Sequence, residues 1–260
     1  MKKIFLAALL AALLLCSGCM ATVDQMYRLP KRSEEVANLQ AAMDSAMDGL
    51  SYSAPLTGEN QQTVQTVDLD GDGDLEYVVF AKGYSEKPMK ILIFSKENEH
   101  YQLRSVIESN GSAFDRVEYI QLDGTGGMEI MAGYQVSDQV LRSVCVYRFD
   151  GSQTTRLVNA NYARFITCDL DRDGLSEIMV LRPGILETDN GVAELYGMEN
   201  GVVERSNEAV MSESVYKLKR LITGKLHDGV PAVFVGSTVE SGGIITDIYA
   251  LVDGVFTNVS

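Results

Sequence analysis

The stretch that decides the expected fold is Asp68-Leu69-Asp70-Gly71-Asp72-Gly73-Asp74-Leu75-Glu76. Carboxylates stand at its relative positions 1, 3, 5, 7 and 9, and the two glycines allow the backbone to curl around one centre. Apolar residues of β-type flank the stretch, as in Tyr77-Val78-Val79-Phe80. The pattern therefore predicts an acidic loop between two strands.

The acidic stretch recurs along the chain at a nearly constant interval. Three further stretches align with it: 120–134, 166–182 and 222–237. When Asp70, Asp123, Asp171 and His227 are aligned, their separations are 53, 48 and 56 residues. A period of about fifty residues indicates a repeat architecture.

Each repeat has room for four short strands, which are separated by turns rich in glycine, aspartate and asparagine. Four antiparallel strands per repeat form the unit of a β-propeller blade. We therefore expect an all-β fold, a β-propeller-type array of about four four-stranded antiparallel blades over 51–260. The expected repeats are 65–115, 116–161, 162–216 and 217–260.

The first and third loops carry oxygen ligands for a hard cation. Carboxylates this close together repel one another unless a cation neutralises them, and calcium accepts about six to eight oxygens in a flexible shell. We expect a structural calcium ion in each of these two loops. The expected first-loop ligands are the side chains of Asp68, Asp70, Asp72 and Glu76 and the carbonyl of Asp74. The expected third-loop ligands are the side chains of Asp169, Asp171, Asp173 and Glu177 and the carbonyl of Leu175.

The other two loops have lost carboxylates. The second retains Asp123 and Glu129 but has Gln121 and Thr125 at the other two ligand positions. We expect it to bind calcium weakly or to form a simple turn. The fourth loop has His227 in place of the central aspartate and is one residue shorter, so we expect no ion there.

Two other interpretations of the acidic loops remain open. An EF-hand loop lies between two helices and ends in a glutamate at its twelfth position. Here the twelfth residue is Val79 in the first loop and Val180 in the third, and the flanking residues predict strands. The loops could also be solvated turns without metal, because turns favour aspartate and glycine.

The first 32 residues predict export and lipid attachment. A positive start is followed by a run of 12 apolar residues, Ile4–Leu15, which is too short for a membrane span of about 20. The small residues before Cys19 resemble a bacterial lipoprotein box, with Cys16 where leucine is preferred. The expected segments are a signal peptide, 1–18, and a lipidated Cys19 with its spacer, 19–32. We thus expect a protein anchored to the outer face of the bacterial cell membrane; an ordinary cleaved secretory peptide is the alternative.

One short helix is expected between the spacer and the repeats. Ser33 is a candidate N-cap, and apolar residues recur at helical spacing from Val36 to Leu50. This pattern predicts an amphipathic helix over 33–50 that packs on the following domain. A coiled-coil seam for dimerisation is the alternative, but it has too few heptads, and we expect a monomer.

Two cysteines remain beyond the signal region. Cys145 and Cys168 both lie in alternating apolar stretches. A disulfide is possible in an exported protein, but buried free thiols are the commoner outcome in such stretches. We expect both thiols to be free.

The composition excludes some functions. The chain has 22 Lys and Arg against 36 Asp and Glu, a net charge of −14, and no basic stripe, so nucleic acid is not an expected partner. No nucleophile elbow, P-loop, dinucleotide fingerprint or HExxH motif occurs, and His100 and His227 lie in polar turns. We expect no catalytic residue and no cofactor besides calcium.

The acidic loops, their place between the first two strands and the period resemble the FG-GAP/VCBS-type repeats of integrin-like β-propellers. The resemblance covers Gln65 to the C-terminus, and it is specific in the DxDGDGxxE loop only, since the Phe-Gly and Gly-Ala-Pro signatures are missing. The whole sequence, with its lipoprotein-like N-terminal segment, short helix and repeats, is similar to bacterial VCBS-repeat lipoproteins. The resemblance implies structural calcium and blade-top loops that bind partners or lie beside an enzyme domain.

The number of repeats raises the question of ring closure. Familiar propellers of this family have seven blades, whereas four repeats are visible here. Residues Tyr52–Leu56 could add a strand to the last blade, the chain could be part of a longer protein, or the array could be an incomplete arc. We favour an open or truncated array over a closed ring of four blades.

Three functions follow from these expectations. The leading hypothesis is a non-catalytic, membrane-anchored calcium-binding module with a protein or glycan ligand. The second is an extracellular polysaccharide hydrolase or lyase, which requires a cleft with paired carboxylates outside the loops. A transporter's solute-binding lipoprotein would need two α/β lobes, and the lack of alternating helices after Leu50 disfavours it.

Overall fold

The computed structural model describes residues 34–98, 100–136, 142–186, 188–199 and 202–260. The expected signal peptide, Cys19, the spacer and Ser33 lie outside these residues. Within the described part of the chain, no helix has the length and apolar character needed to cross a membrane.

The described chain is all-β apart from one α-helix, α3 (Glu34–Ala46), and a short 3₁₀ helix, η1 (Val215–Lys217). Its strands form four antiparallel sheets, each built on four consecutive strands that pair in chain order. Sheet 1 contains β2 (Val64–Val67), β3 (Glu76–Lys82), β4 (Met89–Glu97) and β5 (His100–Ser109), with the short β1 (Ser51–Tyr52) paired to β3. Sheet 2 contains β6 (Ala113–Ile120), β7 (Glu129–Gln135), β8 (Arg142–Phe149) and β9 (Thr154–Tyr162).

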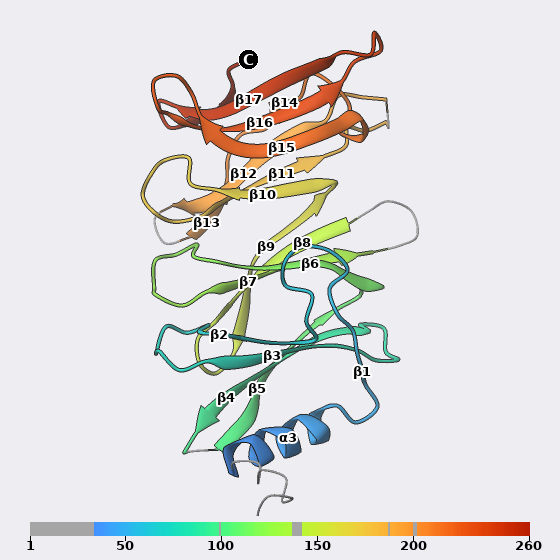
Figure 1. Ribbon diagram of the computed structural model, residues 1–260, viewed down its shortest axis with the longest axis vertical. Helices are drawn as coiled ribbons and strands as arrows, with labels where there is room; N and C mark the ends of the chain where they lie inside the picture. Colours follow the sequence, from blue (N-terminus) through green and yellow to red (C-terminus); the bar gives the residue numbers. More distant parts are fainter. Residues whose placement is uncertain (1–33, 99, 137–141, 187, 200–201) are drawn as a thin grey trace, which may run out of the picture.

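Sheet 3 contains β10 (Arg164–Cys168), β11 (Glu177–Arg182), β12 (Val192–Glu199) and β13 (Val202–Arg205), with the short β14 (Ala209–Val210) paired to β12. Sheet 4 contains β15 (Leu218–Lys225), β16 (Pro231–Thr238), β17 (Ile244–Val252) and β18 (Val255–Asn258). The sheets are stacked in chain order along the long axis, so sheets 1 and 4 lie at opposite ends (Figure 1). The described residues thus form an open stack of blade-like sheets rather than a closed ring.

Apolar layers between neighbouring sheets hold the stack together. One layer joins sheets 1 and 2 through residues such as Phe80 and Phe114, whose rings meet edge-on at 5.2 Å. Equivalent layers join sheets 2 and 3 and sheets 3 and 4. The inner strands β7 and β11 face an apolar layer on each side. They are therefore buried along almost their whole length, and their sequences are mostly apolar.

Helix α3 covers the outer face of sheet 1. Leu39, Met43 and Met47 pack with Val79 and Phe94, so the helix seals the end of the stack that no other sheet covers. The helix begins at Glu34, with two glutamates in its first turn, and ends at Ala46, earlier than expected. Gly49 explains the early end, because its φ of 71° turns the backbone away from the helical path.

A segment after β1 protects the open edge of sheet 2. The Leu56 N–H donates to the Phe114 carbonyl at 3.1 Å, and the Thr57 N–H donates to the Asp115 carbonyl at 2.8 Å. Thr57 also forms a parallel bridge with Arg116 in β6. The suggestion that Tyr52–Leu56 completes the last blade is therefore wrong, because this segment joins sheets 1 and 2 and lies far from sheet 4 (Figure 1). An exposed strand edge invites pairing with other chains, and the segment covers this one.

Both cysteines are free, as expected: Cys145 is buried and Cys168 is partly buried. Burial raises the pKa of both thiols, that of Cys168 to about 12. They are therefore thiols at neutral pH and belong to the packing of their strands.

We predict that Met43→Ala lowers the free energy of unfolding by about 2 kcal/mol, because it leaves a cavity between α3 and sheet 1. Met43 is 7% exposed, whereas Val36 on the same helix is 49% exposed, so Val36→Ala serves as the matched control. Urea unfolding of both variants measures the effect. Equal stabilities of the two would contradict the role of α3 as a cover for sheet 1.

Candidate metal centres

The first three acidic loops share one backbone conformation. In the first, Glu76 accepts a hydrogen bond from the Leu69 N–H at 2.8 Å. Glu129 and Glu177 accept the same bond from the residue seven places before them, at 2.8 and 2.6 Å. Each glutamate begins the second strand of its sheet and is buried. The ninth position is therefore a fixed, buried carboxylate that points back into its own loop.

The fourth residue of each of these three loops has a left-handed backbone conformation. Gly71, Gly124 and Arg172 occupy it with φ angles of 79°, 71° and 69°. The arginine is strained there by roughly 1 kcal/mol relative to glycine. Its side chain offsets this strain through a contact with the next sheet, because Arg172 Nη2 donates to the Gly229 carbonyl at 2.5 Å.

The loops of the first three sheets are stacked on each other along one edge of the molecule, the left edge in Figure 1. The Met128 N–H of the second loop donates to the Asp68 carbonyl of the first at 3.1 Å. The Ser176 N–H of the third donates to the Gln121 carbonyl of the second at 2.7 Å. Gly127 allows the close approach, since a Cβ there would lie 2.3 Å from the Leu69 carbonyl oxygen.

Two clusters of carboxylates in the described residues could hold a metal ion, one in the first loop and one in the third. Within each cluster, one oxygen from every member lies within 4.8 Å of the others. The third-loop cluster contains all four expected side chains, Asp169, Asp171, Asp173 and Glu177. The first-loop cluster contains Asp68, Asp70 and Glu76.

The structure leaves part of the expected ligand set outside the clusters. Asp72 is not in the first-loop cluster, and its exposed carboxylate accepts a hydrogen bond from the Asp74 N–H at 2.8 Å. Its counterpart Asp173 makes the same bond to the Leu175 N–H at 2.7 Å and still belongs to its cluster. The carbonyl ligands expected from Asp74 and Leu175 stay predictions.

Without a cation, the carboxylates of these two loops are electrostatically unsatisfied. Burial, reinforced by the charges of the neighbouring aspartates, raises the pKa of Glu76 to about 7 and that of Glu177 to about 7. Burial and the charges of Asp72 and Asp68 raise the pKa of Asp70 as well. Each loop thus concentrates negative charge that only protonation or a bound cation can relieve.

A basic side chain from a neighbouring strand lies beside the carboxylates of the second loop. Arg148, from the third strand of sheet 2, forms an ion pair with Asp123 at 2.5 Å and lies 3.7 Å from Glu129. Although burial opposes it, hydrogen bonds from Thr125 and the charge of Arg148 lower the pKa of Asp123, whereas the equivalent Asp70 has a raised pKa. The pKa of Glu129 is still raised to about 7, because burial outweighs the more distant guanidinium. Arg148 thus lies beside the two carboxylates for which weak calcium binding or a simple turn was expected, and calcium binding at Asp123 and Glu129 stays a prediction.

The strand register explains why, among the described residues, the second loop has such a cation and the first and third do not. Tyr147 pairs with the residue after the loop glutamate, and Phe94 and Tyr196 occupy the same place in sheets 1 and 3. The next residue along the strand is Arg148 in sheet 2 but Ser95 in sheet 1 and Gly197 in sheet 3. A Cβ at Gly197 would lie 3.1 Å from Cγ of Glu177, so this position faces the loop carboxylates. Small residues there leave room for an ion.

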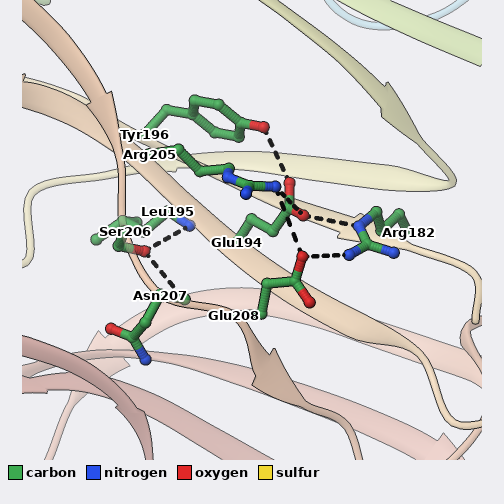
Figure 2. Close-up of polar contacts among 8 residues, drawn as sticks. All are labelled: Arg182, Glu194, Leu195, Tyr196, Arg205, Ser206, Asn207 and Glu208. Carbon is green, nitrogen blue, oxygen red and sulfur yellow. Dashed lines mark hydrogen bonds and ion pairs between the residues drawn. The ribbon is translucent and has the colours of Figure 1, made fainter.

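A buried carboxylate on sheet 3 provides a comparison. Glu194 is 2% exposed and accepts hydrogen bonds from Arg182 at 2.7 Å, Tyr196 at 2.9 Å and Arg205 at 3.1 Å (Figure 2). Burial alone would raise its pKa, but these donors lower it. Arg182 also bonds Glu208 at 2.6 Å, so the network is satisfied within the chain. Asp247 on sheet 4 is also fully buried and is satisfied by hydrogen bonds from Ser212 and Asn258. Outside the first and third loops, the buried carboxylates of the described residues are thus satisfied by a basic side chain or, as at Asp247, by several hydrogen-bond donors.

The fourth loop is a tight turn of a different kind. The Leu226 N–H donates to the Val230 carbonyl at 2.8 Å, and the Gly229 N–H donates to the Leu226 carbonyl at 2.9 Å. The carboxylate clusters found in the described residues do not include this turn. Its two ends face a hollow of about 410 Å³ between sheets 3 and 4, which Asp169 and Arg172 also line.

Comparison of the chain with known protein families and with curated proteins finds no match.

We predict that Arg148→Gln lowers the free energy of unfolding by about 2 kcal/mol, because it leaves Asp123 and Glu129 buried without a cation. The control is Arg104→Gln, which removes an ion pair with the exposed Glu97 and a 3.4 Å hydrogen bond to the Gly151 carbonyl but leaves no buried carboxylate behind, so it should change stability by less than about 1 kcal/mol. Chemical unfolding of both variants in a metal chelator measures the difference. Equal effects would contradict the role of Arg148 as the cation of the second loop.

We predict that the melting temperature gained on adding calcium increases with pH between about 5.5 and 8. Since the metal-free folded pKa values of Glu76 and Glu177 are about 7, above the ordinary value of 4.5, their contribution to stability is full below pH 4.5 and is lost as pH rises through 7. Calcium binds the deprotonated forms, so protons compete with it in the same range. Thermal melts with calcium and with chelator across the pH series measure the gain, and a constant gain would count against these glutamates as ligands.

Proposed function

We propose that the chain is a calcium-stabilised module of FG-GAP/VCBS, β-propeller type that binds a protein or glycan at the bacterial cell surface. In this proposal it is exported, anchored through a lipid on Cys19, and works without catalysis as a monomer. The observation that carries the proposal is the contrast among the three stacked loops. One loop pairs its buried carboxylates with Arg148, and the other two combine a fuller set of carboxylates with a small residue at that place.

Calcium is the cation that best matches these clusters. All their side-chain donors are carboxylate oxygens, which hard cations prefer, and the nitrogen and sulfur ligands typical of zinc are absent from both clusters. Magnesium demands a nearly ideal octahedron at short distances, whereas an irregular loop with room for water suits the flexible shell of calcium. In the third loop the aspartates are exposed and Glu177 is buried, so water can complete the coordination from the open side.

A structural role for the ion is supported by where the loops lie. Each ion would tie the turn between the first two strands to the buried glutamate of the second strand. Because the loops are hydrogen-bonded to one another across the sheets, holding one loop also supports its neighbour.

We predict that the chelator-stripped protein binds two calcium ions, with dissociation constants on the order of 10⁻⁵ to 10⁻⁴ M, and gains roughly 1–3 kcal/mol per site at millimolar calcium. Asp70→Asn and Asp171→Asn should each remove one site, since the amide oxygen can still accept the backbone hydrogen bond but carries no charge. Asp253→Asn, in the β17–β18 turn at a φ of 51°, is the control with the same charge change. Calorimetric titration counts the sites, and no binding would overturn the proposal.

A second candidate function, action on polysaccharide, is favoured by one cavity. Glu59 and Glu118, which lie outside the acidic loops, line a hollow of about 490 Å³ between sheets 2 and 3, together with Gln121, Met128 and Ser176 of the second and third loops. Burial raises the pKa of Glu118, as a general acid requires, although its ion pair with Arg116 opposes the shift. For this function we predict that the unmodified chain releases reducing sugar from at least one of a panel of acidic and neutral polysaccharides. Glu118→Gln should abolish the release. Glu86→Gln, an exposed control in the β3–β4 turn of sheet 1, should retain it. No release by the unmodified chain would eliminate this candidate.

A further inference from the structure

A second cavity between sheets 2 and 3 lies at the strand ends opposite to the acidic loops. Its volume is about 290 Å³. Its charged and aromatic lining comes from three successive places in the chain: β6, the start of β8, and the junction of β9 with β10. The residues that the argument uses are Asp115, Arg116, Arg142, Tyr162, Arg164 and Phe165.

The cavity concentrates positive charge in an acidic protein. Three arginines line it beside a single carboxylate, although the whole chain has 22 basic and 36 acidic residues. The carboxylate, Asp115, is 4% exposed and already has partners, since Tyr162 Oη donates to it at 2.5 Å and Arg142 Nε lies 3.6 Å away. Arg164 has no acidic partner among the described residues; its Nη1 donates to the neighbouring Ala163 carbonyl at 2.8 Å. Arg116 forms an ion pair with Glu118, which lies outside the lining, so Arg164 provides the guanidinium that remains for an anion from outside.

The aromatic wall fixes the geometry of the cavity. Tyr162 and Phe165 are each 4% exposed, and their rings meet edge-on at 4.9 Å. The Arg116 guanidinium lies over the Phe165 ring, with Cζ 5.1 Å from its centre. The buried Nε of Arg116 has no hydrogen-bond partner among the residues that the structure describes. A buried donor of this kind calls for an acceptor.

We propose that this cavity binds a pyranose-sized ring that carries one carboxylate, such as a uronic acid. The planar guanidinium fork matches a carboxylate, which it can hold through two parallel hydrogen bonds. The volume accepts one sugar ring and no longer chain. A monoanion fits better than a phosphate dianion, because Asp115 in the same wall repels a second negative charge. A free sugar acid and the end unit of an acidic glycan share this chemistry.

The test is calorimetric titration of the full chain, isolated in mild detergent with calcium present, against D-galacturonate, D-galactose and galactose 6-phosphate. Galacturonate should bind at least about tenfold tighter than either of the other two. Trigalacturonate binding about tenfold tighter than the monomer would identify a glycan end as the source, and equal binding would identify the free acid. Galacturonate binding no tighter than galactose, or weaker than the phosphate, would overturn the proposal.

Two variants locate the site. Arg164→Gln should weaken galacturonate binding about tenfold without affecting the fold, because this side chain is exposed and bonds only a neighbouring carbonyl in the described structure. Arg142→Lys keeps the charge beside Asp115 but removes the fork, so it should weaken binding less. Arg104→Gln, on sheet 1, is the control and should bind as the unmodified chain does. Unchanged binding in Arg164→Gln would overturn the proposal.

The inference is independent of the metal centres. Asp171→Asn protein that has lost one calcium ion should still bind galacturonate, since the two sites lie at opposite ends of their strands. Loss of both activities together in this variant would contradict that independence.

Discussion

Burial of a glutamate at the turn between the first two strands is the constraint on which the other features of this protein depend. In three of the four sheets this glutamate closes the loop by accepting the hydrogen bond from its second residue. The same arrangement takes a charge out of water beside one to three aspartates, which is unfavourable unless a cation is present. The second loop meets this requirement with Arg148 and the satisfied Glu194 network meets it with Arg182 and Arg205. The first and third loops have no such side chain within the described residues.

The loops also link the sheets. Their backbones are hydrogen-bonded from one sheet to the next, and Gly127 permits a contact closer than any side chain would allow. Apolar layers hold the faces of the sheets together, while the loops hold one edge in register. An ion in the first or third loop would therefore stabilise the stack as well as the turn that binds it. Helix α3 covers the one end face that the sheets leave open near the N-terminus.

The sequence predicted those parts of the fold that repeat or alternate. The period and the acidic turns led to four antiparallel sheets, and the apolar spacing from Val36 to Leu50 led to a helix against the first of them. The suggested pairing of Tyr52–Leu56 with the last sheet was wrong. A short segment pairs with whichever strand edge lies nearby, and the sequence pattern alone does not reveal that edge. Asp72 lies outside the first-loop cluster because of local side-chain geometry, which the spacing of the carboxylates in the sequence cannot predict.

Arg148 was missed for a different reason. It lies 25 residues beyond Asp123 in the sequence, so a search for acidic spacing passes over it. Only the pairing of β7 with β8 brings it to the loop. A signal was nevertheless present, because alignment of the third strands places Ser95, Arg148 and Gly197 together. A basic residue at this place of the third strand, in a repeat whose loop retains only part of its carboxylates, is the pattern to seek in related chains.

The most direct test of this account is a crystal structure of the protein grown with calcium, with anomalous scattering recorded at a wavelength where calcium contributes strongly. The account predicts two anomalous peaks, one among Asp68, Asp70 and Glu76 and one among Asp169, Asp171, Asp173 and Glu177. In the second loop it predicts the Arg148 guanidinium beside the carboxylates and no peak. A peak in the second loop with Arg148 displaced, or no peak in the first and third, would contradict the claim that each buried glutamate in these loops is matched by one cation.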